Sequence, residues 1–252
     1  MKDKIRLNIG GGGIFSKIML AIQNIAAFDY GIENCYLNIA DNRALGLNDS
    51  NPLDSILNQQ YDEKYVFTDC RPLVPYSVNN RIEESVDYLK LRHIISQLSY
   101  KQELRVLVDD FKYMLGIDQN TIGVHLRLCD MNIQHGADYG YFTFDNYVEK
   151  IRQELDYNTK IFVASDNNES IKKLQTLFGN RILYLPGLIR AETEVENSVK
   201  LQIENFREVR FWREAFIEML LLSKCSKLIC RTSNLANMAI LSSNTIQKVI
   251  ML

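Results

Sequence analysis

The sequence predicts an α/β protein with parallel sheets. Short apolar runs rich in β-branched residues alternate along the chain with longer runs of helical periodicity, which is typical of successive β-α-β units. The chain has 252 residues, enough for one large domain or two small ones. A break at 116–120 falls between two halves that both show this alternation. We therefore expect two α/β domains, 1–118 and 119–252.

The first domain is expected to open with a strand, four glycines and a helix. Gly31 is expected to stop that helix as a left-handed C′ residue, and Gly116 closes the last helical pattern of the domain. The expected strands are 5–9, 35–39 and 65–67, and the expected helices are 14–30, 81–98 and 101–115.

The second domain repeats the pattern. Its second strand ends in Ser165-Asp166, and either residue suits the N-cap of the next helix, which Gly179 stops. The expected strands are 121–126, 160–164, 181–185, 227–230 and 247–251, and the expected helices are 144–155, 169–178, 206–223 and a short one ending near 241.

Composition narrows the class of protein. Apolar residues make up 46% of the chain, charged residues 24%, and the net charge is −2, as in an ordinary globular domain. Like charges form no block, which argues against nucleic-acid and membrane-surface partners. The five cysteines show no C-x-x-C spacing, so we expect free thiols in the cytoplasm or another reducing compartment. No apolar run reaches the roughly 18 residues of a membrane span.

The run 121–128 delivers a histidine and an arginine from a buried strand. His125 and Arg127 are two residues apart, so a strand points both toward one face. In an α/β protein the carboxyl end of a strand overlooks the crevice in which ligands bind. The planar guanidinium suits a diphosphate or a carboxylate. The alternative is a salt bridge from Arg127 to a neighbouring loop.

A second anion-suited segment follows a later strand. It reads Arg231-Thr232-Ser233-Asn234, with hydroxyls, a positive charge and the free N–H groups of a helix start. Helix capping would account for only one of these hydroxyls. Asp166 ends the strand between the two segments, where it could accept bonds from a nucleotide or orient Arg127. Two anion-suited segments in one domain predict a diphosphate ligand.

The first domain offers a loop and a candidate base. Gly11, Gly12 and Gly13 lie between a strand and a helix, where the backbone can approach a ligand closely or simply turn tightly. The run matches neither a phosphate loop nor G-x-G-x-x-G. Asp41, just beyond a strand, is the candidate general base, with an Asx turn as the alternative. Asp69 and Asp130 are the next candidates.

We expect no metal site. The chain has no D-x-D triplet and no H-x-x-x-H, and its three histidines are scattered. A diphosphate bound without a divalent cation would be neutralised by arginine and by helix N-termini, which the two segments supply.

Three blocks resemble the fucosyltransferase superfamily, which includes nodulation α1,6-, α1,2- and protein O-fucosyltransferases. The blocks are His125-Leu126-Arg127, Phe162-Val163-Ala164-Ser165-Asp166 and Arg231-Thr232-Ser233-Asn234-Leu235-Ala236, in the family's order. The glycine-rich start is similar to the family's acceptor-side loop. The chain also resembles the compact xylosyltransferases of chlorovirus glycan synthesis, which would place it in a host cytoplasm.

The resemblance implies a GT-B-like architecture of two facing Rossmann-like domains with the active site in the cleft between them. It implies an acceptor-side domain at 1–118, a nucleotide-sugar domain at 119–252, inversion at the anomeric carbon and no metal. Arg127 would hold the departing diphosphate, His125 would support its loop and Asp166 would face the nucleotide. Thr232, Ser233 and Asn234 would bind phosphates.

Two departures limit this transfer of roles. Leu128-Cys129 follows Arg127 where the 1,2-transferring branch has arginine or polar residues, and the chain is short for the family. The acceptor type therefore does not transfer with the blocks.

The function predicted is metal-independent transfer of a sugar from a nucleotide diphosphate to a glycan hydroxyl. UDP-xylose is the favoured donor, GDP-fucose the alternative, and a fucose-containing glycan a candidate acceptor. Two other classes stay open. One is a glycan- or nucleotide-binding module without catalysis. The other is an NAD-dependent oxidoreductase, which the missing G-x-G-x-x-G disfavours.

Overall fold

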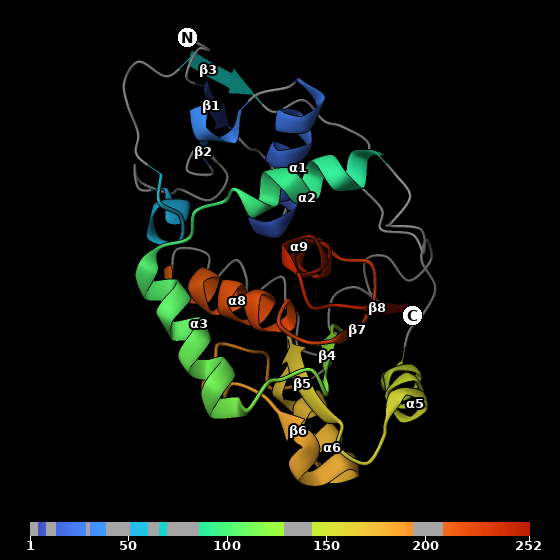
Figure 1. The fold of residues 1–252 in the computed structure, drawn as a ribbon. Helices are drawn as coiled ribbons and strands as arrows, with labels where there is room; N and C mark the ends of the chain where they lie inside the picture. Colours follow the sequence, from blue (N-terminus) through green and yellow to red (C-terminus); the bar gives the residue numbers. More distant parts are fainter. Residues whose placement is uncertain are drawn as a thin grey trace. The chain divides into compact units, whose positions relative to one another are not determined.

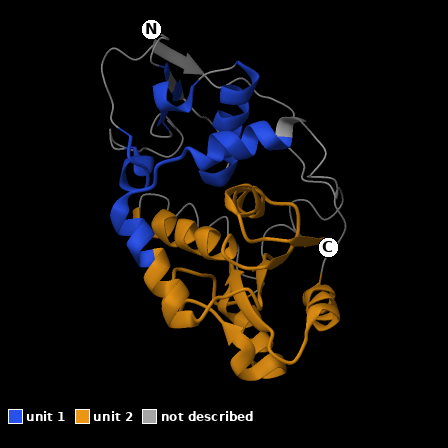
Figure 2. Cartoon of the chain, in the orientation of Figure 1, with its two compact units in different colours: residues 1–107 blue, residues 108–252 orange. Residues whose placement is uncertain are grey.

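The computed structural model of the chain describes residues 5–8, 14–28, 31–38, 51–59, 66–69, 86–128, 143–193 and 209–252 (Figure 1). The backbone divides into two compact units, 1–107 and 108–252 (Figure 2). This division falls inside helix α3 (Gln102–Leu115), whereas the domain boundary expected from the sequence follows that helix. Both units are α/β, as the sequence predicts.

Unit 1 contains a three-stranded parallel sheet in the order β2-β1-β3. The strands are β1 (Ile5–Asn8), β2 (Cys35–Asn38) and β3 (Val66–Asp69). Helix α1 (Ile14–Ala27) buries Ile14, Ile18, Ile22 and Ile25, whose spacing of three and four residues forms one apolar stripe. Helix α2 (Val86–Ser96) packs against α1. This unit also contains two short 3₁₀ turns, η1 (Ile32–Asn34) and η3 (Pro52–Ser55).

Unit 2 contains a five-stranded parallel sheet in the order β6-β5-β4-β7-β8. Its strands are β4 (Thr121–Leu126), β5 (Lys160–Ser165), β6 (Ile182–Leu183), β7 (Lys227–Cys230) and β8 (Lys248–Met251). The chain adds β5 and β6 on one side of β4, then returns to add β7 and β8 on the other. This is the doubly wound order, and its topological switch point lies between β4 and β7.

Helices cover both faces of this sheet (Figure 1). Ile122, Val124 and Leu126 of β4 pack with apolar residues of α5 (Phe144–Glu154) and α6 (Asn168–Phe178). The other face contacts α8 (Val209–Leu222), beside which lies α9 (Asn234–Ser242). A Cβ at Gly123 would lie 3.0 Å from the Leu222 side chain, so glycine allows α8 to approach β4 closely.

The glycine stops have mixed outcomes. Gly116 and Gly179 have positive φ values of 66° and 61° at the ends of α3 and α6, so these two predictions are confirmed. The prediction for Gly31 is wrong. Helix α1 ends at Ala27, and Gly31 has a φ of −74° because it leads into the 3₁₀ turn before β2.

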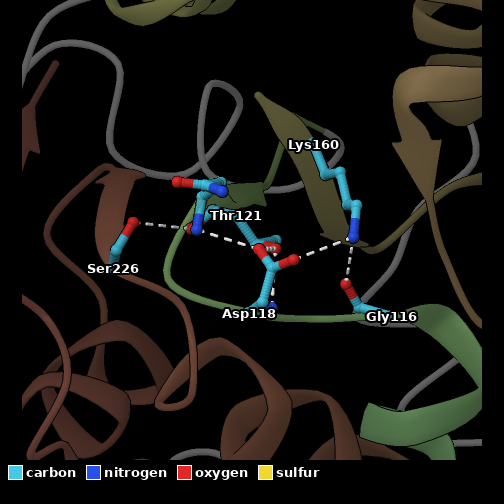
Figure 3. Close-up of polar contacts among 6 residues, drawn as sticks. Gly116, Asp118, Thr121, Lys160 and Ser226 are labelled. Carbon is cyan, nitrogen blue, oxygen red and sulfur yellow. Dashed lines mark hydrogen bonds and ion pairs between the residues drawn. The ribbon is translucent and has the colours of Figure 1, made fainter. Parts of the chain in front are cut away.

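The amino ends of the unit 2 strands are closed by a small polar network (Figure 3). Lys160 Nζ donates to the Gly116 carbonyl at 2.7 Å and to Asp118 Oδ2 at 2.9 Å. Thr121 Oγ1 donates to Asp118 Oδ1, and the Thr121 carbonyl accepts from both the N–H and the hydroxyl of Ser226. Partial burial raises the pKa of Asp118, but hydrogen bonds from Lys160, Asn120 and Thr121 outweigh it and hold the value low.

Candidate functional site

The candidate site lies at the carboxyl ends of β4 and β7. In doubly wound sheets ligands bind outside the carboxyl ends of the strands, at the point where the strand order reverses. Strand β4 ends at Leu126 and β7 ends at Cys230, so the segments 125–128 and 230–234 span these two strand ends. His125 pairs in register with Cys230 of β7 on one side and Ala164 of β5 on the other. The topology therefore brings together three blocks far apart in the sequence.

His125 connects β4 to the start of α9. Its Nδ1 lies 3.2 Å from Ser233 Oγ, and that oxygen accepts the Ala236 N–H at 3.1 Å as the N-cap of α9. Burial, helped by the positive charge of Arg127, lowers the pKa of His125 to about 3. The imidazole is therefore neutral near pH 7. It fixes the Ser233 side chain rather than supplying a charge.

The segment after β7 has the features of an anion site. Arg231 is 4% exposed, while Thr232, Ser233 and Asn234 are half-buried around the first turn of α9. Ser233 is the capping hydroxyl, so capping accounts for one of the two hydroxyls, as the sequence analysis anticipated. The free N–H groups at the start of α9, which closely follow the buried Arg231 in the sequence, favour a bound anion.

Arg127 lies just past the end of β4. Its N–H donates to the buried Tyr147 hydroxyl at 3.5 Å, and the next N–H, of Leu128, donates to Asp166 Oδ1 at 3.5 Å. Arg127 itself is half-buried, and its charge acts on the His125 ring. The backbone of this exit is thus held from α5 and from the turn after β5.

Asp166 is not the N-cap of α6 (Asn168–Phe178). The N-cap of α6 is Asn167, whose side chain accepts the Ser170 N–H at 2.8 Å, so the prediction of Ser165 or Asp166 as the cap is wrong. The helix starts at Asn168, which is one residue later than a cap at Asp166 requires and two residues later than a cap at Ser165 requires. Asp166 Oδ1 instead accepts from Asn167 Nδ2 and from the Leu128 N–H. This contact holds the backbone one residue beyond Arg127, and the predicted roles of Asp166 toward Arg127 and toward a nucleotide stay predictions.

The glycine loop of the first domain and the candidate general bases stay predictions. Gly11, Gly12, Gly13, Asp41 and Asp130 lie outside the described residues. Asp69 is the last residue of β3, and its Cα pairs with Asn8 of β1. The identity of the general base stays a prediction.

The sequence reasoning missed a buried ion pair beside the site. Arg190 is 8% exposed and pairs with Glu218 of α8, and it also donates to the carbonyl oxygens of Ser165 at 3.0 Å and Leu185 at 2.9 Å. Burial raises the pKa of Glu218, although Arg190 opposes this effect. A single carboxylate inside the apolar run 216–222 was the signal for this pair.

Neither a metal-ligand cluster nor a membrane-spanning helix is found in the part of the chain that the structure describes. Among the described residues, no three histidine, cysteine, aspartate or glutamate side chains gather as a metal site would require. None of the helices in the described ranges is long and apolar enough to cross a bilayer.

Solved structures that are similar to this chain include fucosyltransferases. The NodZ α-1,6-fucosyltransferase co-crystallised with GDP has a TM-score of 0.58 and 16% identity, with 96% of this chain and 93% of that chain covered. The fucosyltransferase NodZ from Bradyrhizobium has a TM-score of 0.59 and 15% identity, with 100% of this chain and 95% of that chain covered. POFUT1 in complex with GDP-fucose has a TM-score of 0.52 and 8% identity, with 100% of this chain and 98% of that chain covered. This chain has the GT-B fold of these enzymes.

The predicted resemblance is thereby confirmed at the level of the fold, over nearly the whole chain. No protein-family model matches the sequence, and no curated protein does.

Proposed function

We propose that the chain is a glycosyltransferase that moves a sugar from a nucleotide-diphosphate donor to a glycan hydroxyl, with inversion and without a metal. The observation that carries the proposal is the contact between His125 and Ser233 at the switch point of the sheet. This contact joins the first block that resembles the fucosyltransferase superfamily, which ends in Arg127, to the third block, which begins with Arg231. A diphosphate is the ligand whose charge and size these groups suit.

Arg127 is assigned to the departing diphosphate. As the bond between sugar and phosphate lengthens, negative charge grows on the diphosphate. A guanidinium then binds the transition state more strongly than the ground state. Arg231 and the first N–H groups of α9 neutralise the remaining phosphate charge. Asp166 holds the segment of Arg127 and faces the nucleotide.

His125 is a positioning residue in this scheme. With a pKa of about 3 it is a poor proton acceptor at neutral pH, and we therefore assign the activation of the acceptor hydroxyl to a carboxylate. Asp41 is the first candidate, followed by Asp69 and Asp130. Donor binding is assigned to 119–252 and acceptor binding, with Gly11, Gly12 and Gly13, to 1–118.

GDP-fucose becomes the first donor to test. The sequence favoured UDP-xylose, but NodZ was soaked with GDP-fucose and POFUT1 was crystallised with it. UDP-xylose remains the second donor, on the resemblance of the whole chain to the chlorovirus-type enzymes.

A thermal-shift screen with GDP-fucose, UDP-xylose, GDP and UDP tests the proposal. A ligand at about 100 times its Kd stabilises the fold that binds it by about 2.7 kcal/mol. We expect one donor and its matching nucleotide to raise the melting temperature without added metal. Slow hydrolysis of that donor would then separate a transferase from a binding module. A shift with NAD and with none of these four compounds would support the oxidoreductase instead.

A further inference from the structure

The segment 184–191 runs past the end of β5 without forming a strand there. The ladder between β5 and β6 stops at the pair Phe162 and Leu183, although β5 continues to Ser165. Beyond it the two segments meet through separate hydrogen bonds. The Ala191 N–H donates to the Asp166 carbonyl at 3.0 Å, and the Asn168 N–H donates to the Ala191 carbonyl at 2.8 Å. The turn that carries Asp166 is therefore held by the segment 184–191.

Arg190 anchors that segment from inside the protein. Its guanidinium contacts three parts of unit 2: the Ser165 carbonyl at the end of β5, the Leu185 carbonyl, and Glu218 on α8. A buried ion pair is weak evidence for stability, because desolvation of both charges offsets their attraction. An apolar pair could fill the same volume. What apolar side chains cannot supply is a fixed donor for the Ser165 carbonyl, one residue before Asp166.

The contacts continue from this pair to the candidate site. Asp166 Oδ1 accepts the Leu128 N–H, and Leu128 directly follows Arg127. We propose that Arg190, with Glu218 as its counter-charge, is a positioning residue, which fixes the Asp166 turn and, through it, the exit of β4 that carries Arg127. This inference rests on the proposed function, because the quantity it predicts is nucleotide affinity.

Two conservative variants separate positioning from stability. Arg190→Lys keeps the charge pair but removes the fork that reaches three acceptors at once, so the Asp166 turn loses a constraint. We expect roughly a two- to thirtyfold weaker Kd for the nucleotide that the wild type binds, GDP or UDP. Glu218→Gln keeps an oxygen that accepts from Arg190 but removes the compensating charge. We expect a lower melting temperature with an unchanged Kd below it.

Glu154→Gln is the matched control. Glu154 also holds cations, Lys227 and Lys248, but at the opposite end of the same sheet. Its loss should leave the Kd unchanged. All Kd values are measured on the full chain by calorimetry, well below each melting temperature. If Arg190→Lys does not fold, the double variant Arg190→Met/Glu218→Leu tests the same step, with the same expected loss of affinity.

The outcomes are distinguishable. A wild type that binds neither GDP nor UDP overturns the proposed function. A wild type that binds one of them, with the same Kd in Arg190→Lys or the double variant, overturns the positioning role alone. A weakening of Kd that merely follows the melting temperature across all variants, including Glu154→Gln, also overturns it.

Discussion

The two ends of the five-stranded sheet differ in how they treat charge. At the amino ends, Asp118 pairs with Lys160, and both side chains are more than a third exposed. Glu154 accepts from Lys227 at 2.8 Å and from Lys248 at 2.6 Å. These hydrogen bonds lower the pKa of Glu154 and favour its charged form. Each carboxylate here is paired with lysines whose side chains are at least a third exposed, and these pairs hold the strand ends together.

At the carboxyl ends burial decides instead. It lowers the pKa of His125 and raises that of Glu218, in each case against the charged form. Arg231 and Arg190 are also buried there. Perturbed groups of this kind cluster at functional sites because burial is retained there at the expense of stability. The two ends should therefore respond differently to substitution: the amino end in stability alone, and the carboxyl end in both stability and nucleotide binding.

Removing one partner of the buried pair should give the largest effect. Glu218→Leu leaves Arg190 buried without its counter-charge, which destabilises a fold by about 3–5 kcal/mol. Urea unfolding of the variant beside the wild type measures this loss. A change under about 1 kcal/mol would mean that water reaches the pair, and the contrast between the two ends would fail.

Arg127→Ala should have the next largest effect, and on activity. Loss of one transition-state donor costs on the order of 3–4 kcal/mol, or roughly a hundred- to a thousandfold in turnover. Arg127→Lys should not restore it, because the bidentate fork is lost. Donor turnover by each variant tests this, with urea unfolding as the control for folding. Near-full turnover in Arg127→Ala removes Arg127 from the proposed site.

Much of unit 2 was predictable because its signals are local. The run 121–126 became the central strand with unchanged bounds, and Gly116 and Gly179 stop helices with positive φ. The sequence also placed segments 125–127 and 231–234 around one crevice, because each follows a strand, but it did not predict the contact between His125 and Ser233. Hydrophobic period and turn chemistry are short-range properties, and they agree with one another here.

What the sequence did not predict depends on long-range packing. The partner of Glu218 is 28 residues away in an irregular segment, and no periodicity connects the two. The N-cap of α6 moved to Asn167 because Asp166 bonds to Leu128, 38 residues away. Competition between local capping and a distant partner cannot be resolved from a single stretch of sequence.

The third largest effect should be on the pH dependence of stability, which should differ between the two ends of the sheet. The folded-state pKa of His125, about 3, lies below its unfolded value of about 6.5. The unfolded chain therefore takes up the proton first, and stability falls as the pH drops below 6.5, by about 2 kcal/mol at pH 5. Asp118 and Glu154, with lowered pKa values, lose their contribution only below their ordinary values of 3.8 and 4.5.

Urea unfolding at pH 7 and pH 5 measures this loss, with His125→Asn as the control. The variant lacks the buried imidazole, so its stability should change less over this range. An equal loss in both proteins would assign the acid sensitivity to other groups.

Ser233→Ala should give a smaller effect on stability and a measurable one on binding. The variant removes the N-cap of α9, which costs about 1 kcal/mol, and it also removes the partner of His125 Nδ1. Urea unfolding and nucleotide calorimetry together test this. Ser243→Ala, past the other end of α9, is the control that should leave the nucleotide Kd unchanged.

Lys160→Met should have the smallest effect, and it tests most directly whether the two ends of the sheet act independently. The pair with Asp118 is solvated and screened, so its loss is expected to cost roughly 0.2–1 kcal/mol. The methionine keeps the apolar stem that packs beside β4. Because Lys160 lies at the opposite end of β5 from Asp166, the nucleotide Kd should not change. Equal Kd values with slightly lower stability would show that the amino end serves the fold alone. A weakened Kd would mean that strain at one end of β5 reaches the other, and the two ends could no longer be treated as separate.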